Sequence, residues 1–278
     1  MAYDAATGTV VLFGGTQSGG GVLSDTWTWD GANWAKQAPA THPAARADAA
    51  VAYDAATGTV AMFGGRNNNS VYFHSTWTWD GVNWAKQAPT NYPAAREGAS
   101  MAYDPATRTV VLFSGVRRTG RRFPDTWTWD GVNWTKQAPQ TRPPGRFGAA
   151  MAYDAATGNV VLFGGLNGRS RPIHDTWTWD GVNWAKQAPA TSPPAQYGPS
   201  MAYDAATGNL VLFSNANGSG PGGTWTWDGV NWTKQAPATS PPARTLASMA
   251  YDAATHNVVL FGGLGNAVFG DTWTWGTG

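Results

Sequence analysis

The stretch "DTWTWDGVNW" at residues 125–134 decides the fold, because the chain repeats it in every part of its length. Near copies stand at 25–34, 75–84, 175–184 and 223–232, and a shorter copy, "DTWTW", stands at 271–275. All 17 tryptophans of the chain lie within these copies. A ligand-binding surface would not need the same indoles in every copy, whereas a repeated core would. We therefore expect the tryptophans to pack inside the protein.

A second marker, the tripeptide "AYD", places the copies in repeating units. The units start near residues 1, 51, 101, 151, 201 and 249, so the period is 50 residues and falls to 48 once. Repeats of about this length that are built from short apolar runs are typical of β-propellers, in which each unit is one blade. The sequence predicts an all-β fold: a single six-bladed propeller over residues 1–278, with four-stranded antiparallel blades.

Each unit divides into four strands, which we name A, B, C and D. In the second unit the alternation and the turn residues predict strand A at 47–53, strand B at 59–63, strand C at 76–79 and a strand D that begins at Trp84. The "DAATG" and "DG" segments between them are turn sequences. Only five of the six units contain a strand D. The last blade should lack its outer strand and expose the edge Thr272–Trp275 to self-association.

Four features of each unit resemble the kelch repeat: "VLFGG" at the end of strand B, the tyrosine of "AYD", the tryptophan of "NW" and the arginine of "PAAR". The chain departs from that pattern at Ser114-Gly115, at Ser214-Asn215 and at Gln196. The resemblance implies a six-bladed propeller from a family used mostly for protein binding and sometimes within enzymes. A shared fold does not transmit one function.

The loops of the six units differ much more at one end of the blades than at the other. The A–B and C–D turns are nearly invariant and hold eleven aspartates, which we expect to cap the turns rather than to bind calcium. The B–C and D–A loops, expected on the opposite rim, hold almost all aromatic and arginine side chains outside the repeat. Variable loops on a rigid scaffold commonly bind ligands. Our candidates there are Tyr72, His74, Tyr92, Glu97, Arg117, Arg118, Arg121, Arg122, Phe123, Phe147, His174 and Tyr197.

Arginine also recurs at the entrance to strand A, at Arg46, Arg96, Arg146 and Arg244. Two interpretations stay open. The arginines could form salt bridges with the aspartate before strand C, and the fifth unit lacks both residues, with Gln196 and Gly223. The second unit does not fit, since it has Arg46 but Ser75. Alternatively, the kelch resemblance implies that these arginines bind anionic groups, so all four are also candidate ligand-binding residues.

Net charge, cysteine content and the spacing of the ionisable residues exclude several classes of function. The formal net charge of +1 gives no specific signal for nucleic acid, and the absence of cysteine excludes thiol chemistry. No apolar run is long enough to cross a membrane. The four histidines lack metal-ligand spacing, and Glu97 has no carboxylate near it in sequence, so we expect no catalytic residue, metal or cofactor. The compartment stays open: extracellular if a leader was removed, otherwise cytoplasmic.

We therefore expect a non-catalytic scaffold that binds a protein or peptide through the B–C and D–A loops. The four arginines of the segment "VRRTGRRF" at 116–123 suggest that an acidic partner binds there. The alternatives are a carbohydrate-binding lectin, an enzyme with its site at the channel mouth, and an engineered or recently amplified scaffold without an evolved ligand.

Overall fold

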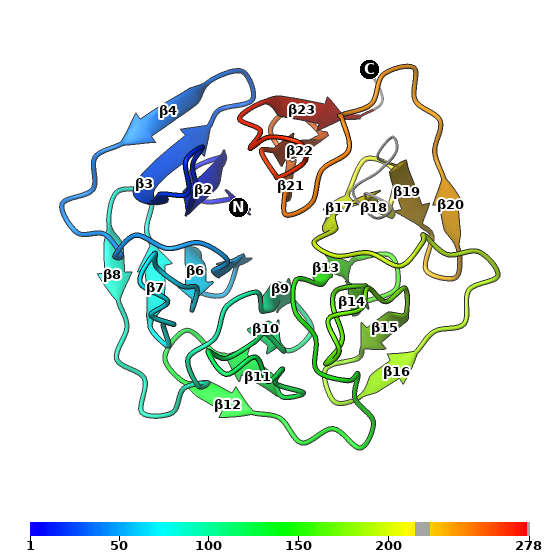
Figure 1. The fold of residues 1–278 in the computed structure, drawn as a ribbon, viewed down its shortest axis with the longest axis horizontal. Coiled ribbons are helices and arrows are strands. Elements are labelled where there is room, and N and C mark those ends of the chain that lie inside the picture. Colours follow the sequence, from blue (N-terminus) through cyan, green and yellow to red (C-terminus); the bar gives the residue numbers. More distant parts are fainter. Residues whose placement is uncertain (215–222, 277–278) are drawn as a thin grey trace. The chain divides into compact units, whose positions relative to one another are not determined.

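The computed structural model describes residues 1–214 and 223–276, and the regular elements of these residues are all β-strands. They form six antiparallel sheets, of which five have four strands and the last has three (Figure 1). The fold is the all-β, six-bladed β-propeller with repeated blade motifs that the sequence predicts, including the three-stranded last blade. Among the described residues no helix has the length and apolar character needed to span a membrane. Asn215, named above as a departure, lies outside the described residues.

The chain divides into two compact units, Met1–Ala138 with Asp252–Thr255, and Pro139–Tyr251 with His256–Gly278. Blades one to three belong to the first unit, and within each blade the strands follow one another in chain order. Their bounds are β1 Ala2–Asp4, β2 Thr9–Thr16, β3 Val22–Trp29 and β4 Trp34–Gln37; β5 Ala50–Asp54, β6 Thr59–Phe63, β7 Thr76–Trp79 and β8 Trp84–Lys86; β9 Ser100–Asp104, β10 Thr109–Phe113, β11 Thr126–Trp129 and β12 Trp134–Lys136.

The second unit contains blades four and five and most of blade six, in the same strand order. The bounds are β13 Ala150–Asp154, β14 Asn159–Phe163, β15 Thr176–Trp179 and β16 Trp184–Lys186; β17 Ser200–Asp204, β18 Asn209–Ser214, β19 Gly223–Trp227 and β20 Trp232–Lys234; β21 Ser248–Asp252, β22 Asn257–Phe261 and β23 Thr272–Trp275.

The start of strand A differs from the prediction. Strand β5 begins at Ala50, three residues after the predicted start, and ends at Asp54. The reason is Asp48, whose φ of 56° lies in the left-handed region that a strand cannot contain. Ala47 instead forms an isolated bridge with Arg66 of the B–C loop. Residues 47–49 therefore belong to the loop region in which we look for a site.

The prediction that the tryptophans pack inside the protein holds for nine of the 17, whereas the other eight, among them the first tryptophan of every strand C, are half-buried. Trp84 opens β8 in the second blade and meets the ring of Phe13 in the first blade, with 5.2 Å between ring centroids. Trp232 of the fifth blade packs on Phe163 of the fourth in the same way, also at 5.2 Å. Eight tryptophans are fully buried. The strands D of the second, third and fifth blades thus each contribute one large ring to the core between their own blade and the preceding blade.

The aspartates of the invariant turns cap those turns, as expected. Oδ1 of Asp54 accepts a hydrogen bond from the backbone N–H of Ala56 at 3.0 Å, and Oδ1 of Asp130 accepts from Val132 and Asn133 at 2.8 and 2.7 Å. Glycine is required beside Asp130, because Gly131 has a φ of 94° and a Cβ there would lie 2.5 Å from Cγ2 of Thr57 in the neighbouring blade. Close packing of turns explains why these loops do not vary.

The D–A segments do not run only along the variable rim. The segment after β4 first contacts the strand D of the next blade: the backbone N–H of Trp84 donates to the carbonyl of Thr41 at 3.1 Å. The N–H of Ala40 donates to Oδ1 of Asn83 at 2.7 Å. Only the second half of the segment, which ends near Arg46, reaches the B–C loop. The expected rim therefore consists of the B–C loops and the later residues of the D–A segments.

Candidate functional site

Arg96 is buried beside the third blade and has a complete set of hydrogen-bond acceptors. Its Nη1 and Nη2 donate to the two carboxylate oxygens of Asp125 at 2.6 and 3.0 Å, and further N–H groups donate to the carbonyls of Ser114 and Ala94. Only 1% of Arg96 is exposed. Burial by itself raises the pKa of Asp125, but the hydrogen bonds and charge of Arg96 outweigh it and leave the pKa below its ordinary value. This is a buried, two-pronged ion pair.

The same ion pair recurs in two other blades. Arg146 binds Asp175 at 2.6 Å, and Arg244 binds Asp271 at 2.5 Å. The hydrogen bonds from Arg244 lower the pKa of Asp271 to about 2. These contacts confirm the salt-bridge interpretation for three of the four arginines. Any role in anion binding stays a prediction.

An aromatic ring of the B–C loop covers three of the four arginines. The Arg96 guanidinium carbon lies 4.0 Å from the ring centroid of Phe123, a candidate from the sequence. Phe73 and Phe269 cover Arg46 and Arg244 at 4.2 Å each. These phenylalanines therefore shield the arginines from water, a structural task that sequence reasoning did not assign to them.

A charged cluster joins the D–A and B–C loops of the second and third blades. Glu97, 7% exposed, accepts a hydrogen bond from the hydroxyl of Tyr72 at 2.9 Å and pairs with Nε of Arg66 at 2.5 Å. Asp48 lies 3.9 Å from the same nitrogen. Burial and the charge of Glu97 raise the pKa of Asp48 to about 6, against the opposing charge of Arg66. Two of the sequence candidates, Tyr72 and Glu97, are thus brought together.

The same loop framework is built without charges in other blades. Arg66 bridges to Ala47 and Tyr72, whereas the equivalent bridges join Leu166 to Phe147 and Pro172, and Leu264 to Thr245 and Val268. The position of Asp48 is glycine in three other units, at Gly98, Gly148 and Gly198, all with φ near 60°. The charged residues are therefore not needed to form the loops.

The arginine-rich loop is a separate feature of the third blade. Arg117, Arg118 and Arg121 are exposed, while Arg122 is half-buried and its Nη1 donates to the carbonyl of Gly120 at 2.7 Å. A tight turn closes the loop, since the N–H of Arg117 donates to the carbonyl of Arg121 at 3.1 Å. Three of the four candidate arginines thus present their charges to solvent.

In the second unit, candidates Phe147 and Tyr197 stack on each other. Their ring centroids are 5.6 Å apart and their planes differ by 21°. The backbone N–H of Leu246 donates to the carbonyl of Gly198, next to Tyr197, and Leu246 is 36% exposed. This part of the second unit offers an apolar surface at positions where the first unit has charges.

Candidates His74 and Tyr92 form an exposed stack in the second blade. The ring centroids lie 5.0 Å apart with an angle of 25° between the planes, and Tyr92 is 49% exposed. His74 comes from the B–C loop and Tyr92 from the D–A segment that follows the same blade. The two rings therefore close the space between these two loops.

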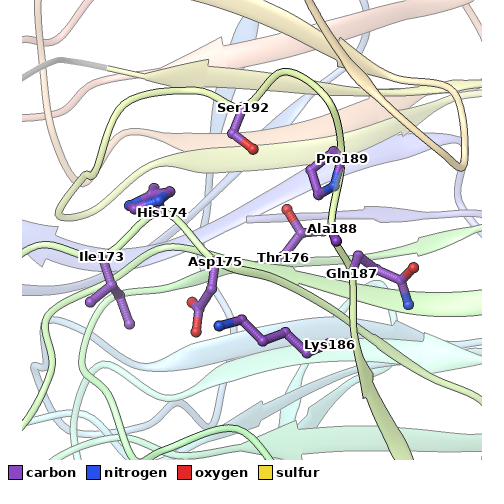
Figure 2. A pocket seen from close by; sticks show the side chains of 9 residues that line it. All are labelled: Ile173, His174, Asp175, Thr176, Lys186, Gln187, Ala188, Pro189 and Ser192. Atoms are coloured by element: carbon purple, nitrogen blue, oxygen red, sulfur yellow. The ribbon is translucent and has the colours of Figure 1, made fainter.

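The fourth blade has an open cleft at the equivalent place. The cleft has a volume of about 450 Å³ and lies between the B–C loop at Ile173–Thr176, the end of β16 and the D–A segment up to Ser192. Figure 2 shows the side chain of His174 on one side of it, with Ser192 and Pro189 on the opposite loop. Candidate His174 is exposed.

The cleft is lined by a small side chain where the equivalent place in the second blade holds an aromatic ring. His174 is equivalent to His74, and Ser192 stands where the segment after the second blade has Tyr92. Tyr92 stacks on His74, whereas Ser192 has no ring and lines the cleft together with His174. Sequence reasoning named both histidines and Tyr92 but missed Ser192 and Asp48. A comparison of the repeats at positions 92 and 192 would have found Ser192. The only sequence signal for the left-handed conformation of Asp48 is the glycine at the equivalent position of three other repeats.

Comparison with known proteins adds no assignment: no protein-family model matches the chain, and no curated protein gives a significant match. Within residues 1–214 and 223–276, no three histidine, aspartate or glutamate side chains gather in a way that could hold a metal ion. The candidate site therefore has to be interpreted from its own geometry.

Proposed function

We propose that this chain is a non-catalytic propeller of the kelch type that binds a protein or peptide partner through its B–C and D–A loops. The invariant turns are occupied by capping and by close packing, as at Asp130 and Gly131. The loops at the other end carry different side chains in each blade on one backbone framework. A rigid scaffold with variable loops suits recognition of one asymmetric partner.

The observation that supports the proposal most is the cleft beside His174. In the second blade the chain itself places an aromatic side chain, Tyr92, on the equivalent histidine. The His74–Tyr92 stack shows that the space between the B–C loop and the D–A segment accommodates an aromatic ring against the histidine. In the fourth blade the place is open, so an aromatic side chain from a partner can occupy it.

The residues around the cleft suit a peptide that carries an aromatic ring. The imidazole of His174 offers a face for stacking, which contributes about 0.5–1.5 kcal/mol beyond the area buried. Lys186 and Gln187 line the opposite part of the cleft and can bind backbone carbonyls of the peptide. The pKa of Asp175 lies below its ordinary value, because the hydrogen bonds and charges of Arg146 and Lys186 outweigh burial. It is ionised at neutral pH and can accept an N–H.

A paired screen tests the proposal. The purified protein is offered a library of random peptides and, in parallel, a glycan array, and each hit is repeated with Ser192→Tyr. We expect peptides with an aromatic residue to be selected, and Ser192→Tyr to abolish their binding by supplying the ring from within. The reverse change, Tyr92→Ser, should open a second cleft and raise the number of bound peptides.

Two results would count against the proposal. Binding to glycans with no peptide selected would favour the lectin. Peptide binding that Ser192→Tyr leaves unchanged would place the contact somewhere other than the cleft.

A further inference from the structure

Within the described part of the chain, Arg46 of the second blade is buried without a carboxylate partner. Only 2% of it is exposed, and its acceptors are the carbonyls of Ala44 and Gly64, each at 3.0 Å, and Oγ of Ser75 at 3.2 Å. Among the described residues its Nη2 has no acceptor. Burial lowers the pKa of Arg46 to about 10, which still leaves it protonated at neutral pH. An uncompensated buried charge is costly, so this arrangement needs an explanation.

Three other blades show what is missing. In each of them an aspartate carboxylate stands where the second blade has Ser75, and it binds both Nη1 and Nη2 of the arginine. The same carboxylate accepts the indole N–H of the first tryptophan of strand C, at 2.9 Å from Trp127 to Asp125. In the second blade Trp77 donates to Oγ of Ser75 at the longer distance of 3.3 Å. Serine therefore takes over part of the carboxylate's contacts and leaves the negative charge absent.

The fifth blade indicates that the buried arginine and its aspartate are kept or lost together. There the arginine and the aspartate are both replaced, by Gln196 and Gly223, so neither charge is present. The second blade alone keeps the arginine without the aspartate. A lysine of strand D also faces this place: Lys36 lies 3.7 Å from Asp25, and Lys86 has the same register, opposite Trp77. The second blade thus has a buried guanidinium, and an exposed lysine on the neighbouring strand, near a position with no aspartate.

We propose that the second blade binds a small monovalent anion, of the size of chloride or formate, beside Ser75. The anion takes the place of the carboxylate of the other blades. Nη2 of Arg46 and the hydroxyl of Ser75 donate to it, and Lys86 adds an attractive charge. The ring of Phe73, 4.2 Å from the guanidinium carbon, shields the opposite side of Arg46 from water. The replacement of a carboxylate group by a hydroxyl supplies the room for one small ion, whereas a large anion does not fit.

The test is the anion dependence of thermal unfolding. The melting temperature of the parent chain is measured in sodium chloride and in sodium gluconate at equal ionic strength. We expect chloride to raise it by about 2–4 °C more than gluconate does, since an anion that binds only the folded state stabilises it. Ser75→Asp should remove this difference and should melt higher than the parent in gluconate, because it supplies the carboxylate from within the chain.

The third blade provides the matched control. Asp125→Ser recreates the arrangement of the second blade and should acquire a chloride-specific rise in melting temperature. Crystals soaked in bromide give a second measurement that does not depend on any variant, with an anomalous peak expected within hydrogen-bond distance of Oγ of Ser75. An equal chloride effect in the parent and in Ser75→Asp, or a bromide-soaked crystal with no peak beside Ser75, would overturn the proposal.

Discussion

The indole N–H of Trp84 donates a hydrogen bond of 2.9 Å to Oγ1 of Thr26, a buried residue of the preceding blade. Trp134 makes the equivalent bond to Thr76 at 2.8 Å, and Trp232 to Thr176 at 2.9 Å. At these three interfaces the first threonine of the "TWTW" segment and the tryptophan that opens strand D of the next blade are therefore partners. This explains why both recur in the repeat. A buried indole N–H that loses its acceptor costs about 1–3 kcal/mol, which is less than the packing of the ring contributes.

The first prediction concerns this contact. Trp134→Ala should lower the free energy of unfolding by about 3–5 kcal/mol, because it empties a core position filled by a large ring. Thr76→Val keeps the packing but leaves the indole N–H of Trp134 without its acceptor, and should cost about 1–3 kcal/mol. Chemical denaturation of both variants measures the two values. A loss for Thr76→Val as large as that for Trp134→Ala would show that the hydrogen bond, not the packing, dominates.

The second prediction concerns the pH dependence that Asp48 introduces. Its pKa is about 6 in the folded chain, above the ordinary value of 3.8, so the folded state binds the proton more tightly than the unfolded state does. The ionised Asp48 therefore destabilises the fold above pH 6, and this penalty fades as the pH falls from 6 to 4. Asp48→Asn, which also tolerates a positive φ, should be more stable than the parent by about 1–3 kcal/mol at pH 7–8.

The measurement is the unfolding free energy of the parent and of Asp48→Asn between pH 4 and pH 8. We expect the difference between them to be largest at pH 7–8 and to shrink towards pH 4. A constant difference over this range would mean that the pKa of Asp48 is not raised. Glu97→Gln is the control for the neighbouring charge, because its removal should bring the pKa of Asp48 down.

The third prediction follows from the exposed arginines of the third blade. We expect the loop at 117–122 to attract acidic partners, and heparin chromatography serves as the probe. Replacing Arg117, Arg118 and Arg121 by serine should make the protein elute at a lower salt concentration. Arg122 is left in place, because it is half-buried and bonded within the loop. The matched control replaces Lys36, Lys136 and Lys234, which are exposed on strand D, by serine. Equal elution of the parent and the arginine variant would refute the expectation.

The fourth prediction concerns the edge of the sixth blade. Among the described residues β23 pairs only with β22, whereas each other strand C also pairs with a strand D. We expect the edge Thr272–Trp275 to support self-association at high concentration. Thr274→Lys, at an exposed position of β23, should shift sedimentation towards the monomer. A monomeric parent at every concentration would contradict this.

The strands and the core could be predicted from the sequence because their cause is local and repeated. Alternation placed β6 and β7 at the residues observed, and the turn residues before Trp84 placed β8. The burial of nine of the 17 tryptophans followed from their recurrence. The start of β5 could not be predicted, since nothing in "ADAAVAY" shows that Asp48 adopts a left-handed conformation.

The candidate site was less accessible to sequence reasoning, because it depends on contacts between loops far apart in the chain. Glu97 was named for its type, but its partners Arg66 and Tyr72 come from the loop of another blade. Phe123 was expected to contact a ligand, and its contact with Arg96 could not be foreseen from the sequence. The cleft beside His174 is lined by Ser192 where the second blade has Tyr92, a difference that only a comparison of the repeats at this position shows.

The proposed contact between His174 and an aromatic side chain of a partner can be measured directly by a double-mutant cycle. A peptide from the screen and its aromatic-to-alanine variant are each titrated against the parent chain and against His174→Ala by calorimetry. Stacking predicts a coupling free energy of about 0.5–1.5 kcal/mol between the two changes. A coupling of zero, with the peptide still bound by the parent chain, would contradict the account.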